Sequence, residues 1–239
     1  LGIAALLRQS ILPWLVVLGM YLLSVGYRHQ RFNRALASLS LAAIITLVFI
    51  LPFTWRNYIA YGELLLLNSN AGYAMYSAQH PMHGTSFKEY TAAPLPADLI
   101  ALGLNEAQWD KALTVRGVEF VLADPGRYFL LLFCRVRDYF EFLATADSSL
   151  VFDLGRVLSF GLFLPFMLYG LFLSFRPGLL AHSPLLAYHF RLLYLFIVVY
   201  SLLHIFTWAM SRYRLPVDAV LVLFAALAIW RLSMSFKRA

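Results

Sequence analysis

Five stretches of the chain are apolar over nearly the length that a helix needs to cross a membrane. A helix spans the hydrocarbon layer with about 20 mostly apolar residues. Leu, Ile, Val and Phe dominate these stretches, and the prolines within them are tolerable because neighbouring helices satisfy the freed backbone carbonyls. The pattern predicts spanning helices at residues 11–27, 36–55, 157–175, 192–210 and 215–232.

The long segment between the second and third stretches, residues 56–153, has the mixed polar and apolar pattern of a chain in water or at a membrane surface. Its first half is rich in Asn, Ser, Gly and Pro, which predicts an irregular loop. Asn105 then precedes apolar residues at near-helical spacing, and Asp124 precedes Pro125, so we expect each of these two polar residues to cap a helix. Residues 128–144 mix aromatic, aliphatic and charged side chains, which favours a helix lying in the membrane interface.

Composition agrees with the pattern. Hydrophobic residues make up 62% of the 239-residue chain, charged residues make up 13%, and the mean hydropathy is +0.73. Such values are typical of an integral membrane protein. We therefore expect an all-α fold, a polytopic transmembrane helix bundle of about five spans with a large extracytoplasmic loop that carries interfacial helices. The expected organisation is two spans in residues 1–55, the loop in residues 56–153 and three spans in residues 154–239.

The distribution of charge predicts the orientation of these spans. Lys and Arg gather in short cytoplasmic loops of membrane proteins. The connection between the first two spans, the loop after the third span and the C-terminal segment are basic and free of acid, whereas residues 56–153 hold eleven of the twelve acidic residues. We therefore place the basic loops in the cytoplasm and residues 56–153 outside. The formal net charge of +7 then reflects loop placement, so we expect no nucleic-acid partner.

One outer turn, residues 211–218 with the sequence SRYRLPVD, departs from this charge pattern because it carries two arginines. Arg212 and Arg214 could anchor the turn at the interface, with Tyr213 as an interfacial aromatic. They could also hold a phosphate, because a guanidinium group binds phosphate oxygens through two parallel hydrogen bonds. Asp218 lies inside the last predicted span, where an arginine partner would reduce the cost of burying its charge.

Other arginines at the same predicted level favour the phosphate interpretation. Arg8 precedes the first span, Arg56 follows the second, and Arg156 precedes the third. Each alone could be an anchor, but together they would line a positively charged outer face. The anionic ligand expected at that depth is the phosphate of a lipid head group.

Four segments, in this order, resemble conserved stretches of one enzyme group. The first, LGIAALLRQSILPW, resembles a Gly-Leu-Ala-x-Leu-x-Arg span. The second, LPFTWRNYIAYGELLLLNSNAGYAMY, resembles a Pro-x-x-x-Arg-Asn-Tyr segment that leads to a Ser/Asn-x-Gly-x-x-x-Tyr loop. The third, VEFVLADPGRYFLLLF, is similar to the part of that loop before the next helix, and the fourth, SRYRLPVD, resembles an Arg-Tyr-Arg-x-Pro turn. These stretches occur in the C-terminal half of bacterial polytopic glycosyltransferases of the protein-mannosyltransferase and aminoarabinose-transferase type, glycosyltransferase family 39 of the GT-C superfamily.

The resemblance implies transfer of a sugar from a polyprenyl-phosphate donor to an acceptor on the outer face of the bacterial cytoplasmic membrane. It implies that membrane lipids and the lipid-linked sugar are partners, and it leaves open whether a divalent cation assists. The residues expected to bind the lipid phosphate are Arg212, Tyr213, Arg214, Arg56, Asn57 and, at the same level, Arg8.

The catalytic acid of this family has no counterpart in the sequence. The family places the acidic residue that would accept the acceptor's proton in the first outer loop of its N-terminal half. The present sequence, which begins at Leu1, matches only the C-terminal half, so we expect a portion of a longer enzyme and no catalytic residue in this chain. Asp98, Glu106 and Asp147 lie in the outer loop, where carboxylates are far more often only solubilising.

A second interpretation is a non-catalytic integral membrane subunit of a larger complex, derived from such an enzyme. Its arginines would contact only lipids or other membrane subunits. The side of the second span that bears Ser38, Ser40 and Ala42 would then face a partner helix, since small and polar residues favour helix contacts in membranes. His80 and His83 have no carboxylate or third histidine near them in sequence, so we expect no metal there.

Overall fold

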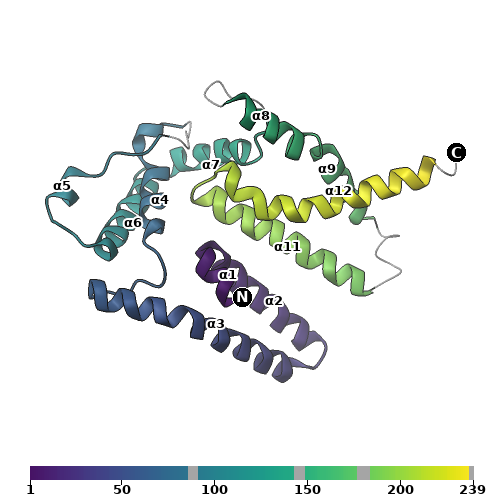
Figure 1. Cartoon of the computed structure of the whole chain (residues 1–239), viewed down its shortest axis with the longest axis horizontal. Helices are drawn as coiled ribbons and strands as arrows, with labels where there is room; N and C mark the ends of the chain where they lie inside the picture. The colour runs from purple at the N-terminus through teal and green to yellow at the C-terminus, as the bar shows by residue number, and fades with distance from the viewer. Residues whose placement is uncertain (86–90, 143–148, 177–183, 237–239) are drawn as a thin grey trace. The chain divides into compact units, whose positions relative to one another are not determined.

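The computed structural model describes residues 1–85, 91–142, 149–176 and 184–236, and these are helical with no strand (Figure 1). The all-α expectation is therefore confirmed. Five helical segments in the described ranges are long and apolar enough to cross a membrane, which confirms the five predicted spans. They are Gln9–Arg28, Phe32–Tyr61, Asp153–Ser174, Tyr188–Phe206 and Ser211–Ser235. The chain forms two compact units, and each is described by itself.

The first unit contains Leu1–Arg135 together with Ile205–Trp208. Its membrane part consists of α1 (Gly2–Leu7), α2 (Leu12–Arg28) and α3 (Phe32–Tyr61), and both shorter helices pack against α3. α3 carries Pro52 in its interior and extends past the predicted second span. It ends at Gly62, whose positive φ of 69° is the left-handed conformation that glycine adopts without a steric penalty.

The remainder of the first unit consists of α4 (Asn70–Gln79), α5 (Ala97–Ile100), α6 (Glu106–Ala123) and most of α7 (Pro125–Tyr139), of which α7 is clearly amphipathic. The Asn105 side chain caps α6, as the sequence predicts, and Gln108 bonds back to it to complete a capping box. The Asp124 carboxylate accepts a hydrogen bond from the backbone N–H of Arg127 at the start of α7, which confirms the second predicted cap.

The prediction of an irregular loop for the first half of residues 56–153 is wrong for Asn70–Gln79, which is helical. Glycine and asparagine are ordinarily loop signals, but here glycine allows two helices to approach closely. A Cβ added at Gly72 of α4 would lie only 2.0 Å from the carbonyl oxygen of Asp110 in α6. Tertiary packing therefore overrides the local signal, and the buried Tyr76 joins the apolar cluster that stabilises α4 against α6.

The second unit contains Val136–His204 together with Ala209–Ala239. Its helices are α8 (Leu150–Arg156), which continues through a π-helical turn at Val157–Gly161 into α9 (Leu164–Ser174), then α11 (Pro184–Phe206), the 3-10 turn η4 (Ser211–Arg214) and α12 (Leu215–Phe236). The buried core residues of this unit are Phe160, Met167, Tyr200, Val217, Leu221, Phe224 and Ala225.

Close contact between α9 and α12 depends on a glycine. A Cβ added at Gly170 would lie 1.8 Å from the carbonyl oxygen of Phe224, so the two backbones touch at this point. Small residues at such crossings are the usual basis of helix association in membranes, because they let backbones approach within van der Waals contact.

Replacing Gly170 with alanine should therefore destabilise the second unit. Overpacking of a tight contact costs about 1–3 kcal/mol, which outweighs the gain of about 0.5–1 kcal/mol that alanine brings to a helix. Gly155→Ala is the matched control, because a Cβ at Gly155 in α8 meets nothing within 4 Å. Thermal unfolding in detergent should show a lower midpoint for Gly170→Ala only, and equal midpoints for the two variants would contradict the contact.

Candidate lipid-phosphate site

The turn between α11 and α12 presents its two arginines in different environments. Met210 is extended (φ −126°, ψ 145°), and the chain then tightens into the 3-10 turn η4, from which α12 starts with Pro216 in its first turn. Arg212 is exposed, whereas the side chain of Arg214 is only 3% exposed. The two arginines are only two positions apart in sequence, but their different exposure gives them different roles.

Most of the hydrogen-bond donors of the Arg214 side chain are bonded within the protein. Its Nε donates to both carboxylate oxygens of Asp218, at 2.9 and 3.1 Å, and its Nη1 donates to the carbonyl oxygens of Tyr139 (2.7 Å) and Glu141 (3.4 Å). The guanidinium carbon lies 3.4 Å from the centre of the Phe160 ring, which adds a cation–π contact. Nη2 makes no hydrogen bond to a described residue.

The pair between Arg214 and Asp218 explains the acidic residue inside a membrane-length helix. The two residues are four apart on one helical face, and the carboxylate is mostly buried beside the guanidinium. An arginine partner for Asp218 was expected from the sequence, and the structure confirms it and selects Arg214 over Arg212.

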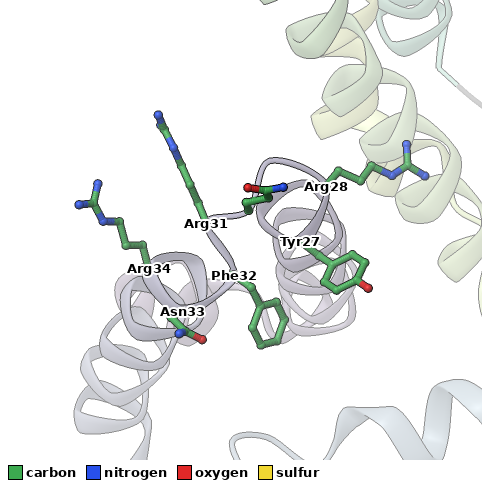
Figure 2. Close-up of a pocket in the computed structure, with 7 residues that line it drawn as sticks. Tyr27, Arg28, Arg31, Phe32, Asn33 and Arg34 are labelled. Carbon is green, nitrogen blue, oxygen red and sulfur yellow. The ribbon is translucent and has the colours of Figure 1, made fainter.

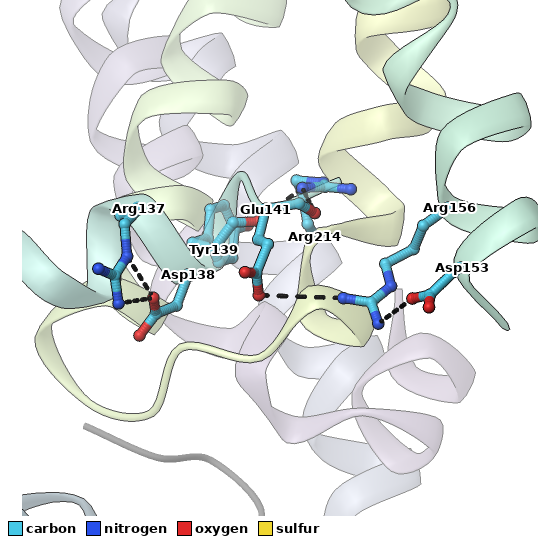
Figure 3. Close-up of polar contacts among 7 residues, drawn as sticks. All are labelled: Arg137, Asp138, Tyr139, Glu141, Asp153, Arg156 and Arg214. Atoms are coloured by element: carbon cyan, nitrogen blue, oxygen red, sulfur yellow. Dashed lines mark hydrogen bonds and ion pairs between the residues drawn. The ribbon is translucent and has the colours of Figure 1, made fainter. Parts of the chain in front are cut away.

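A second ion-pair group adjoins Arg214 within the same unit (Figure 3). Arg156 at the end of α8 lies 3.2 Å from Asp153 and 3.9 Å from Glu141. Glu141 thus pairs with Arg156 through its carboxylate and accepts from Arg214 through its backbone. Sequence reasoning did not identify Glu141 or Asp153 as partners. Their alternation with arginines in amphipathic segments was a weak signal, because Glu141 is 73 residues from Arg214.

Two arginines at this end of the second unit are ion-paired, and a third is not. Arg156 and Arg214 have carboxylate partners, so the positive charge still available to an anion is mainly that of Arg212. The ion-paired cluster consists of Arg156, Arg214, Glu141, Asp153 and Asp218.

Arg212 lies beside a stack of aromatic rings. Its guanidinium lies 5.2 Å from the Tyr213 ring centre, and the Tyr213 ring is stacked on His204 at 4.9 Å. His204 is in turn stacked with Tyr139 at 6.5 Å. Burial raises the pKa of Tyr139 to about 12, so this phenol stays neutral at physiological pH. Arg212 itself stays exposed beside this stack.

The other expected site residues lie in the first unit. Asn57 is 3% exposed, and its Nδ2 donates to the carbonyl oxygens of Leu65 (3.1 Å) and Leu67 (2.8 Å), which ties the chain after α3 back onto that helix. Arg56 is exposed and donates from Nη1 to the Asn57 side-chain oxygen at 3.3 Å. Arg8 follows α1 in an extended conformation (φ −152°, ψ 99°).

The structure thus groups the six residues as two sets. Arg212, Tyr213 and Arg214 share one turn of the second unit, whereas the first unit contains Arg8 and the adjacent pair Arg56 and Asn57. The carboxylates Asp98, Glu106 and Asp147 of the predicted outer loop have different surroundings. Asp98 pairs with Arg116 and Glu106 bonds to Tyr61 and Ser69, whereas Asp147 lies outside the described residues.

Two arginines of α7 organise a further polar segment of the first unit. Arg127 donates to the carbonyl oxygens of Gln79 (2.6 Å), His80 (3.4 Å) and Gly84 (3.3 Å), and the fully buried Arg135 donates to the side-chain oxygen of Gln79 at 3.0 Å. No group of three or more His, Cys, Asp or Glu residues in the described ranges is placed to hold a metal ion. The arginine bonds connect α7 to the residues at the end of α4 and just after it.

Comparison with known proteins adds no relative. No protein-family model matches the chain, and neither a curated protein nor a solved structure matches it.

Asp218→Asn should strongly destabilise the protein, because it leaves the buried guanidinium of Arg214 without a counter-charge. Loss of one member of a buried pair costs about 3–5 kcal/mol. Asp98→Asn breaks the exposed pair with Arg116 and should cost at most about 1 kcal/mol. Thermal or denaturant unfolding of both variants measures the difference, and a similar small loss for both would show that the Arg214 pair is not structurally important.

Acidification should destabilise the first unit through His83. Burial, together with the nearby charges of His80, Arg135 and Arg127, lowers the pKa of His83 in the folded state. The unfolded imidazole takes up a proton near pH 6.5, so stability should fall as pH drops below about 6.5. His83→Gln should reduce the difference in unfolding midpoint between pH 7.5 and 5.5, whereas His29→Gln, on an exposed turn, should leave it unchanged.

Proposed function

We propose that this chain is the C-terminal portion of a membrane glycosyltransferase that uses a polyprenyl-phosphate-linked sugar, and that the turn Ser211–Arg214 binds the donor phosphate. The observation that carries the proposal is the pairing of an exposed arginine, Arg212, with an ordered turn whose conformation is held by the buried Arg214. The ordered resemblance of four segments to such enzymes supports the same function.

The position of the turn suits a lipid phosphate. η4 lies at the start of a helical segment long enough to cross the membrane, so in a bilayer it lies near the head groups. Arg212 makes no ion pair with a described residue, so its guanidinium is available to the phosphate. A phosphate at the turn would thus accept charge-assisted hydrogen bonds without separating Arg214 from Asp218.

The proposal assigns different tasks to the two arginines. Arg212 contacts the ligand, and Arg214 positions the turn because its Nε and Nη1 are already bound within the protein. In the first unit, Arg56 is exposed and donates a hydrogen bond to the side-chain oxygen of Asn57, so its guanidinium is available to an anion at that unit. Activation of the acceptor is left to the acidic residue that the family carries in its N-terminal half.

A second candidate is a non-catalytic subunit of a larger membrane complex. The observation that favours it is the exposure of the Ser38 and Ser40 side chains on α3, inside a span-length helix. Polar groups facing lipid are unfavourable, so a helix of another subunit would be expected to cover them.

The proposal is tested by measuring binding of polyprenyl phosphate to the purified full chain by native mass spectrometry. Arg212→Gln should lower the affinity about 10- to 100-fold, because a charge-assisted hydrogen bond contributes about 1.5–3 kcal/mol. Arg231→Gln is the matched control, since Arg231 is an exposed arginine of α12 outside the turn. The unphosphorylated polyprenol should bind weakly to every variant.

Equal binding of polyprenyl phosphate by the native chain and Arg212→Gln would overturn the phosphate site. Absence of binding, together with stoichiometric co-purification of other membrane proteins from native membranes, would instead favour the subunit. Because Arg212 is exposed, its replacement should leave the unfolding midpoint unchanged, which separates loss of binding from loss of fold.

A further inference from the structure

A second arginine cluster lies at the other end of the α2–α3 hairpin. Arg28, Arg31 and Arg34 line a pocket of about 800 Å³ at the turn between the two helices, together with Tyr27 and Phe32 (Figure 2). All three arginines are exposed, and their side chains make no hydrogen bond or ion pair with a described residue. Their charges are therefore not compensated within the described part of the protein.

The sequence around the pocket strengthens this imbalance. Residues 1–62 contain five arginines and no acidic residue, so the hairpin itself carries no carboxylate that could neutralise the turn. This contrasts with the cluster around Arg214, where Asp218, Glu141 and Asp153 balance most of the charge. Three uncompensated guanidinium groups close together repel one another unless an anion lies among them.

The turn that bears the arginines has a defined conformation. The N–H of Arg31 donates to the carbonyl of Gly26 at 2.8 Å, and the N–H of Gln30 donates to that of Tyr27 at 3.1 Å. This pair of bonds is the hydrogen-bond pattern of a Schellman motif. Gln30 takes the left-handed position with φ 55°. Gly26 permits the close approach of α3, since a Cβ there would lie 2.6 Å from that of Ala35.

The surroundings of the pocket suit the membrane surface. The turn joins two span-length helices, so in a bilayer it lies at the level of the head groups. The rings of Tyr27 and Phe32 are in edge-to-face contact at 6.4 Å, and these residues are 75% and 40% exposed. Exposed aromatic residues of this kind are enriched at membrane interfaces. In Figure 2 the arginine side chains fan outward from the turn instead of converging on one point.

We infer that the Arg28, Arg31 and Arg34 pocket binds the phosphate groups of anionic phospholipids in the surrounding membrane. Guanidinium groups that diverge contact the phosphates of several head groups better than one small anion, and basic pockets beside membrane helices commonly hold anionic lipid head groups. This inference does not depend on the proposed transfer reaction, because the residues involved are not those assigned to the donor phosphate.

The test uses the full chain reconstituted in nanodiscs of phosphatidylcholine and phosphatidylglycerol, followed by native mass spectrometry of the lipids that stay bound. The native chain should retain phosphatidylglycerol preferentially. Each arginine near an anionic surface contributes a factor of about five, so the triple variant R28Q/R31Q/R34Q should lose at least about tenfold of that preference. Nanodiscs expose both faces, so the result does not depend on orientation in the cell.

The control variant R176Q/R191Q/R231Q removes the same total charge from other basic positions and should keep the preference. An equal loss in both triple variants would assign the effect to net charge and overturn the inference, as would an unchanged preference in R28Q/R31Q/R34Q. Displacement of phosphatidylglycerol by millimolar inorganic phosphate would also overturn it by identifying a soluble anion site. Arg212→Gln should keep the phosphatidylglycerol preference, which separates this inference from the proposed function.

Discussion

The buried guanidinium of Arg214 is the constraint on which the polar side of the second unit depends. Removing a charged group from water is costly unless acceptors surround it. Here the acceptors come from three places in the chain: Asp218 on α12, the backbone at Tyr139 and Glu141, and the ring of Phe160 in the π-helical turn. Satisfying one side chain therefore fixes the relative positions of three segments.

The arginines of this protein differ in whether their charge is bonded within the fold or is accessible to a ligand. The arginines that look equivalent in sequence divide into those that hold the protein together, such as Arg214 and Arg135, and those that remain exposed, such as Arg212. The buried arginines are bonded within the protein because an unpaired buried charge is not tolerated near lipid. Only the second kind can attract an anion from outside, so burial and pairing identify the candidate ligands better than residue type does.

Local features of the fold were predictable, and distant contacts were not. The five spans follow from apolar length, and the caps at Asn105 and Asp124 follow from neighbouring residues. The helix Asn70–Gln79 was missed because Gly72 matters through its approach to Asp110, 38 residues away. For the candidate site, the sequence indicated the Arg214 turn and a partner for Asp218, but the bonds to residues 139–141 span more than 70 positions and have no local signature.

The π-helical turn at Val157–Gly161 has a consequence for the comparison of related sequences. Its N–H of Leu162 bonds to the carbonyl of Val157, five residues earlier, so the turn accommodates one residue more than an α-helical turn does. One extra residue rotates the following helix by about 100°. A relative that lacks this residue would show a single-position gap here, and a gapless alignment through α8 and α9 would match lipid-facing positions with core positions. The register of such alignments should therefore be set separately on each side of Phe160.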